Sequence, residues 1–115
     1  RVSPIALAAA YSRLSVSTST TAAQELLAGM RQAASSGTAA RIGSHRGGVL
    51  AKTGTAPCRG RACFANGDGL VLAMLPADQP RLVLLIRQRG TTGATAAALA
   101  GRMLDRLERL EGVGW

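Results

Sequence analysis

The sequence predicts an α+β fold in which three helices pack on a small antiparallel sheet. Apolar residues recur with helical spacing near both ends of the chain. The middle, from about residue 49 to residue 86, instead holds three short apolar runs separated by turn residues, which is typical of strands. With 115 residues, the chain has the length of one domain or of part of one.

The first helix is expected to begin at Ser3 and Pro4. Serine is a favoured N-cap residue and proline suits the first helical position. Three apolar side chains then recur at i, i+4 and i+7 and share one face: Leu7, Tyr11 and Leu14. Residues 15–20 are rich in serine and threonine and show little periodicity, so they are predicted to link this helix to the next.

A second helix is predicted to begin with a capping box formed by Thr21 and Gln24. Its apolar positions fall on one face: Ala23, Leu26, Leu27, Met30, Ala33 and Ala34. Gly37 is a natural stop for this helix. Residues 38–48 are rich in glycine and small residues and are predicted to be an irregular loop.

The first strand is predicted at residues 49–53, followed by Gly54 and, from Pro57 to Asp68, by a loop. Side chains alternate between the two faces of a strand. One face would carry Val49, Ala51, Thr53 and Thr55, and the other would carry Leu50, Lys52 and Gly54.

Residues 70–75 and 82–86 are predicted to form a hairpin, because the six residues between them are too few for a helical crossover. Both runs are almost continuously apolar, so both of their faces should be covered. After a turn at residues 90–93, a last helix is predicted over residues 94–110. Its expected buried face is Ala96, Leu99, Ala100, Met103, Leu107 and Leu110.

The net charge is +8, which is compatible with anionic partners such as nucleic acid, anionic lipid or cell-wall polymer, but the scattered positions of the arginines favour a solvated basic surface. The arginines are scattered and are not interleaved with aromatic residues, so nucleic-acid binding is not expected. Only one of the fourteen basic residues is a lysine, Lys52. Against so strong a bias toward arginine, this lysine is expected to do what arginine cannot, either losing its proton or acting as a compact point charge.

No metal site or other cofactor is expected. The four-residue gap between Cys58 and Cys63 is not a metal-binding pattern, and His45 is the only histidine. The two cysteines would form a local disulfide in an oxidising compartment or remain unpaired thiols, and the sequence favours neither. The most apolar stretch, residues 69–86, is interrupted by proline and charge and is not expected to span a membrane.

The stretch with the clearest chemistry is Lys52-Thr53-Gly54, followed by Thr55. An ammonium group on a strand favours an anionic substrate, and a threonine hydroxyl can bind a carboxylate. Glycine lets a substrate backbone lie close to the strand, and the next backbone N–H can donate to an oxyanion. Lysine-threonine-glycine on a strand is the third motif of the serine acyltransferases that include β-lactamases and penicillin-binding proteins.

The resemblance to the penicillin-binding transpeptidase domain extends over nearly the whole chain, in order. Residues 3–14, SPIALAAAYSRL, resemble a helix of that domain. Residues 49–56, VLAKTGTA, are similar to the strand that bears its third motif, with Leu50 and Ala51 where alanine and glycine are usual. Residues 69–81, GLVLAMLPADQPR, resemble the hairpin that follows.

This resemblance implies that residues 1–115 are the C-terminal segment of a transpeptidase domain with a partial β-lactamase-like fold. Lys52 would bind the serine of the second motif, Thr53 the carboxylate of a stem peptide or β-lactam, and Gly54 and Thr55 would dock the substrate and its oxyanion. The family acts on the outer face of the bacterial inner membrane, in the periplasm or cell wall. Contact with the membrane would then come only through an N-terminal anchor that this sequence lacks.

The first two motifs of the family are absent from this chain. Val49 stands three residues before the only lysine, and Phe64 two residues before the only asparagine, so there is no Ser-x-x-Lys and no Ser-x-Asn. The chain alone is therefore expected to be inactive, and its last strand, at residues 82–86, to present an exposed edge. The alternatives are a non-catalytic module that binds wall polymer or protein, or a remnant of a β-lactamase or D,D-carboxypeptidase.

Overall fold

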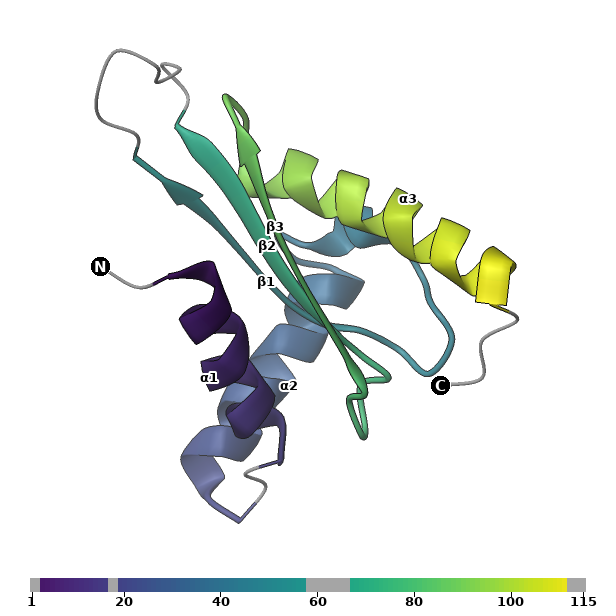
Figure 1. The fold of residues 1–115 in the computed structure, drawn as a ribbon. Coiled ribbons are helices and arrows are strands. Elements are labelled where there is room, and N and C mark those ends of the chain that lie inside the picture. Colours follow the sequence, from purple (N-terminus) through teal and green to yellow (C-terminus); the bar gives the residue numbers. More distant parts are fainter. Residues whose placement is uncertain (1–2, 17–18, 58–66, 112–115) are drawn as a thin grey trace.

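The structure, a computed structural model, describes residues 3–16, 19–57 and 67–111, with only the backbone of Glu111. Three helices and a short 3-10 helix surround an antiparallel three-stranded sheet (Figure 1), which confirms the α+β prediction. The elements are α1 (Pro4–Val16), α2 (Thr21–Ser35), η1 (Ala40–Ile42), β1 (Leu50–Ala56), β2 (Asp68–Leu75), β3 (Leu82–Arg89) and α3 (Gly93–Glu111).

The sheet has the order β1-β2-β3, and both pairs of neighbouring strands are antiparallel. Lys52 lies opposite Leu72, and Leu82 lies opposite Leu75 across the predicted hairpin. All three strands are longer than predicted, because pairing between neighbouring strands continues through polar and small residues. Ala56 of β1 lies opposite Asp68 of β2, and Asp68 lies opposite Arg89 of β3. Within the described residues, β3 pairs only with β2, so its exposed edge is confirmed.

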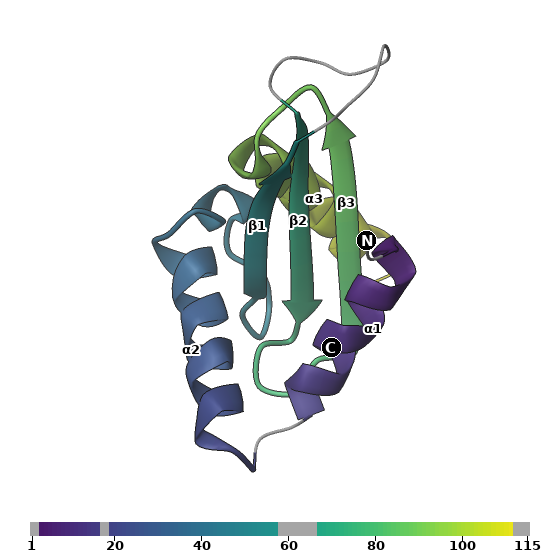
Figure 2. The same cartoon turned by 90° about the vertical axis from the view of Figure 1, so that its left-hand side faces the viewer.

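The helices cover the two faces of the sheet unequally (Figures 1 and 2). α3 lies on one face together with η1, whereas α2 lies beside β1 and α1 beside β3 on the opposite face. The predicted alternation along the first strand is confirmed: Val49 and Ala51 belong to the core beneath α3, and Leu50 belongs to the core beneath α1 and α2. β2 is buried on both faces because it is the central strand.

Both N-terminal helices begin with a side-chain cap. The Ser3 hydroxyl accepts a hydrogen bond from the Ala6 N–H at 3.1 Å, as predicted. At α2 the capping residue is Thr20, whose hydroxyl accepts from the Ala23 N–H at 3.1 Å, so the prediction that Thr21 caps the helix was wrong by one residue. Thr20 has the extended backbone that an N-cap requires, whereas Thr21 is already helical.

The buried face of α3 is rotated from the predicted one. Ala96 and Ala100 are buried as expected, but Met103 is 46% exposed and Leu110 is 72% exposed. The buried residue of this turn is Leu104, which the prediction omitted. The cause is a close approach of the helix to η1: a Cβ at Gly101 would collide with the carbonyl oxygen of Ile42. The helix therefore turns Gly101 toward Ile42, and its neighbours follow.

None of the described helices is both long enough and apolar enough to cross a membrane.

Candidate functional site

Lys52 lies on the edge strand β1, on the face of the sheet that α1 and α2 cover. Its side chain is exposed, whereas the residues on either side of it in sequence, Ala51 and Thr53, are buried. The ammonium Nζ donates a hydrogen bond to the carbonyl oxygen of Thr53 at 2.6 Å. A single backbone carbonyl leaves two of the three N–H donors of an ammonium available to a substrate or another side chain.

A hollow of about 490 Å³ lies beside Lys52, between α1 and α2. Its walls are predominantly apolar and come from both helices and from β1: Ala10, Tyr11, Leu14, Glu25, Leu26, Gly29, Met30 and Lys52. Sequence reasoning assigned Tyr11, Leu14, Leu26 and Met30 to apolar helix faces, and it did not foresee that they line a hollow. The only charged groups among these residues are Glu25 and Lys52. Ligand sites of this kind combine apolar walls with a few polar groups that fix orientation.

Thr53 points to the opposite face of β1 and is 8% exposed. Its hydroxyl forms a hydrogen bond of 2.7 Å with the hydroxyl of Thr38, in the turn that follows α2. The structure thus does not bring Lys52 and Thr53 onto one face of the sheet. Thr38, to which sequence reasoning assigned no role, is the residue that holds the Thr53 hydroxyl in place.

Gly54 has an open side and a packed side. A Cβ at Gly54 would meet no atom within 4 Å, so nothing blocks an approaching backbone there. Behind it lies Gly93, the first residue of α3, where a Cβ would come within 2.8 Å of the Gly54 carbonyl oxygen and within 2.9 Å of the Thr53 Cβ. The start of α3 therefore supports the motif from behind. Gly93 was predicted only as a turn residue.

Thr55 is exposed and lies opposite Gly69 in the ladder. Because β1 is at the edge of the sheet, every second residue along it directs its N–H and C=O groups away from β2. Such an edge can accept an extended peptide as an additional strand. Cys58 and Cys63 lie outside the described residues, and the pairing of these two cysteines stays a prediction.

Away from β1, one histidine and two carboxylates converge. His45, Asp105 and Glu108 each offer a ligand atom, and these atoms lie within 4.8 Å of one another. His45 was noted in the sequence only as the single histidine.

No protein-family model, curated protein or solved structure matches this chain.

Proposed function

We propose that β1 is the substrate-docking strand of a penicillin-binding, peptidoglycan D,D-transpeptidase site. The observation that carries the proposal is the placement of Lys52-Thr53-Gly54 on an edge strand, with Lys52 beside an apolar hollow and open space in front of Gly54. A lone tripeptide would match by chance in many chains. Here the tripeptide lies on an edge strand, and the edge of a sheet can bind an extended stem peptide as an additional strand.

The reaction class is acyl transfer through an acyl-serine intermediate. A serine hydroxyl attacks the carbonyl carbon of the terminal D-alanyl-D-alanine bond, its proton passes to a neighbouring base, and D-alanine leaves. The amine of a second stem peptide then attacks the ester and restores the serine. In this scheme the serine belongs to polypeptide outside the present sequence.

The residues of β1 would position the substrate and stabilise charge. The Lys52 ammonium would raise the positive potential at the site, favouring the substrate carboxylate and the deprotonated form of a neighbouring group. The substrate backbone would lie against Gly54, and a backbone N–H at Thr55 would donate to the oxyanion. For Thr53 to bind the carboxylate with its hydroxyl, that hydroxyl would have to leave or share its bond to Thr38.

Two further features support a site completed by another part of a larger domain. β3 has an unpaired edge within the described residues, which can accept another strand. The face that carries Lys52 also keeps large apolar side chains in solvent: Ile5 is 83% exposed and Leu26 is 57% exposed. Partners that bury such groups would complete both the core and the site. The proposed setting is the outer face of the bacterial inner membrane.

The first test is to read the gene upstream of the Arg1 codon in frame. The proposal predicts a Ser-x-x-Lys motif and then a Ser-x-Asn motif, preceded by a membrane anchor. A frame that closes at once, with neither motif in a neighbouring gene, would contradict it.

A second candidate is a non-catalytic module that binds wall polymer or another protein. It is favoured by the net charge of +8 together with the lack of any Ser-x-x-Lys or Ser-x-Asn in the chain. Covalent labelling of the complete gene product by a β-lactam separates the two candidates, because only the first includes a serine nucleophile. A β-lactamase or D,D-carboxypeptidase parent would differ from the transpeptidase in transferring the acyl group to water instead of to the amine of a second stem peptide.

A further inference from the structure

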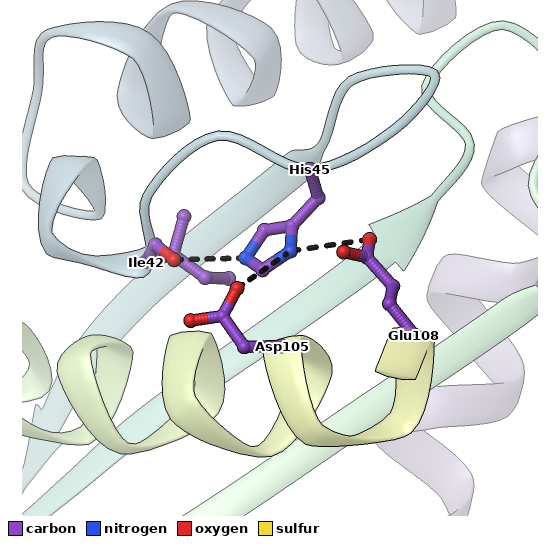
Figure 3. Close-up of polar contacts among 4 residues, drawn as sticks. All are labelled: Ile42, His45, Asp105 and Glu108. Carbon is purple, nitrogen blue, oxygen red and sulfur yellow. Dashed lines mark hydrogen bonds and ion pairs between the residues drawn. The ribbon is translucent and has the colours of Figure 1, made fainter. Parts of the chain in front are cut away.

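His45 is held in a fixed orientation by the backbone of η1 (Figure 3). Its side chain is only 1% exposed, and its Nε2 lies 2.9 Å from the carbonyl oxygen of Ile42. A carbonyl oxygen can only accept a hydrogen bond, so Nε2 must carry a hydrogen and donate it. The tautomer of the neutral ring is thereby determined: Nδ1 carries a lone pair.

That lone pair faces two carboxylates from α3. Nδ1 lies 3.3 Å from Oε1 of Glu108 and 3.7 Å from Oδ1 of Asp105. In the neutral ring, three hydrogen-bond acceptors would therefore converge without a donor between them, which is unfavourable at a buried position. Two arrangements remove this conflict: a second proton on the ring, or a metal cation bound between the three groups.

The two distances from Nδ1 are close to those of a metal site. Zn²⁺ binds histidine nitrogen and carboxylate oxygen at about 2.0–2.2 Å, so two ligands of a tetrahedral site are about 3.3–3.6 Å apart. The two separations from Nδ1, 3.3 and 3.7 Å, are close to this range. The carboxylate oxygens of Asp105 and Glu108 lie within 4.8 Å of each other, and an ion bound to both would hold them closer than that limit. A metal-binding histidine also typically donates its other ring N–H to a carbonyl or carboxylate, as Nε2 does here.

The local structure explains why these groups meet. Gly43 and Gly47 have φ values of 85° and 79°, a conformation that favours glycine, and they bend the loop on either side of His45. On α3, Asp105 and Glu108 are three residues apart and thus share a face. Gly101, one turn earlier, lets this face approach Ile42, the residue that orients the imidazole.

We propose that His45 Nδ1, Asp105 and Glu108 form a binding site for a divalent transition-metal ion such as Zn²⁺. The ion would clamp the loop that leads into β1 onto α3, with water in its remaining coordination positions. The site is accessible from solvent, because the Asp105 side chain is 52% exposed and that of Glu108 is 25% exposed. This inference does not depend on the proposed transpeptidase function. The expectation of no metal site rested on the spacing of the two cysteines and on the single histidine. The site proposed here joins that histidine to carboxylates of α3, and Glu108 is 63 residues away from it in sequence.

The test is zinc titration of the metal-free chain by calorimetry, with Cys58→Ser and Cys63→Ser introduced so that thiolates do not compete. We expect one equivalent of Zn²⁺ to bind and the melting temperature to rise with zinc concentration. Glu108→Gln and Asp105→Asn, which preserve size, should each weaken binding at least about tenfold. Asp78→Asn, a matched carboxamide change at an exposed carboxylate between β2 and β3, should leave the affinity unchanged.

Nuclear magnetic resonance of the ring nitrogens gives a readout that does not require a variant at buried His45. Because the chain has one histidine, a single imidazole is observed. Zinc should shift Nδ1 strongly while Nε2 keeps its hydrogen. A ring that stays doubly protonated in excess zinc, or binding that the two carboxamide variants do not weaken, would overturn the proposal in favour of an ion pair of imidazolium and carboxylates.

Discussion

The two faces of the sheet differ in how completely they are covered. On the face that α3 covers, the helix residues Ala97, Ala100 and Leu104 are at most 1% exposed, and the core continues to η1. Beneath α1 and α2, the buried core is smaller, Leu26 is 57% exposed, and a hollow of about 490 Å³ remains. The face beneath α3 thus has a closed core, whereas the face beneath α1 and α2 is only partly covered.

The motif Lys52-Thr53-Gly54 has side chains on both faces of the sheet. Thr53 faces the core beneath α3 and forms a hydrogen bond with Thr38, and Gly93 of α3 packs against Gly54. Lys52 faces the open side, next to the hollow. The contacts with α3 and with Thr38 support the strand on one face, and on the opposite face the hollow beside Lys52 leaves room for the proposed ligand. Rigid support of this kind is what a binding strand needs.

The largest expected difference between the two faces concerns two leucines. Leu104→Ala, on the buried face of α3, should lower the free energy of unfolding by about 2–5 kcal/mol, because it leaves a cavity in a packed core. Leu26→Ala, on the open face, should change it by less than about 0.5 kcal/mol. Urea unfolding followed by circular dichroism measures both. Equal losses from the two substitutions would show that the faces are equally packed.

Two helical glycines provide a second matched pair. Gly101→Ala should destabilise the chain by about 1–3 kcal/mol, because the new methyl group collides with Ile42. Gly29→Ala has no atom within 4 Å of the new methyl group and should stabilise α2 by about 0.5–1 kcal/mol. Thermal unfolding of both variants checks the sign of each change. A stabilising Gly101→Ala would mean that α3 does not approach η1 as closely as described.

A smaller effect is expected at Thr53. Thr53→Val removes one partner of the bond to Thr38 and should cost about 0.5–1.5 kcal/mol, the net contribution of one hydrogen bond, because the exposed Thr38 hydroxyl can then bond to water. Replacing both threonines by valine should cost less than the sum of the two single changes. A double-mutant cycle of unfolding free energies measures this coupling. Additive costs would indicate that the two hydroxyls do not interact.

Local patterns were enough to predict the order of the three α-helices and three strands and much of the sheet, but not η1, which lies where an irregular loop was expected. The alternation around Lys52 correctly assigned Val49, Ala51 and Leu50 to their faces, because alternation is a property of the strand itself. The connection at residues 76–81 correctly indicated antiparallel pairing, because its length excludes a helical crossover.

What could not be predicted depends on contacts between distant segments. Helical periodicity alone did not distinguish a stripe through Met103 from one through Leu104, because the choice depends on where Gly101 meets Ile42. The bond between Thr53 and Thr38 and the grouping of His45 with Glu108 also arise only when separate elements pack. The candidate strand was therefore predictable from its motif, and its supporting residues were not.

The most direct test of the central claim, that Lys52 belongs to a penicillin-binding site, is covalent labelling of the complete gene product by a fluorescent penicillin. The protein is denatured after reaction and the labelled band is quantified. We expect a covalent adduct whose rate of formation falls on the order of a hundredfold in Lys52→Met, as expected for loss of a group that assists proton transfer and stabilises charge. Arg106→Met, which removes an exposed cation on α3, should label like the wild type. Absence of any adduct, or equal labelling of Lys52→Met and wild type, would contradict the account.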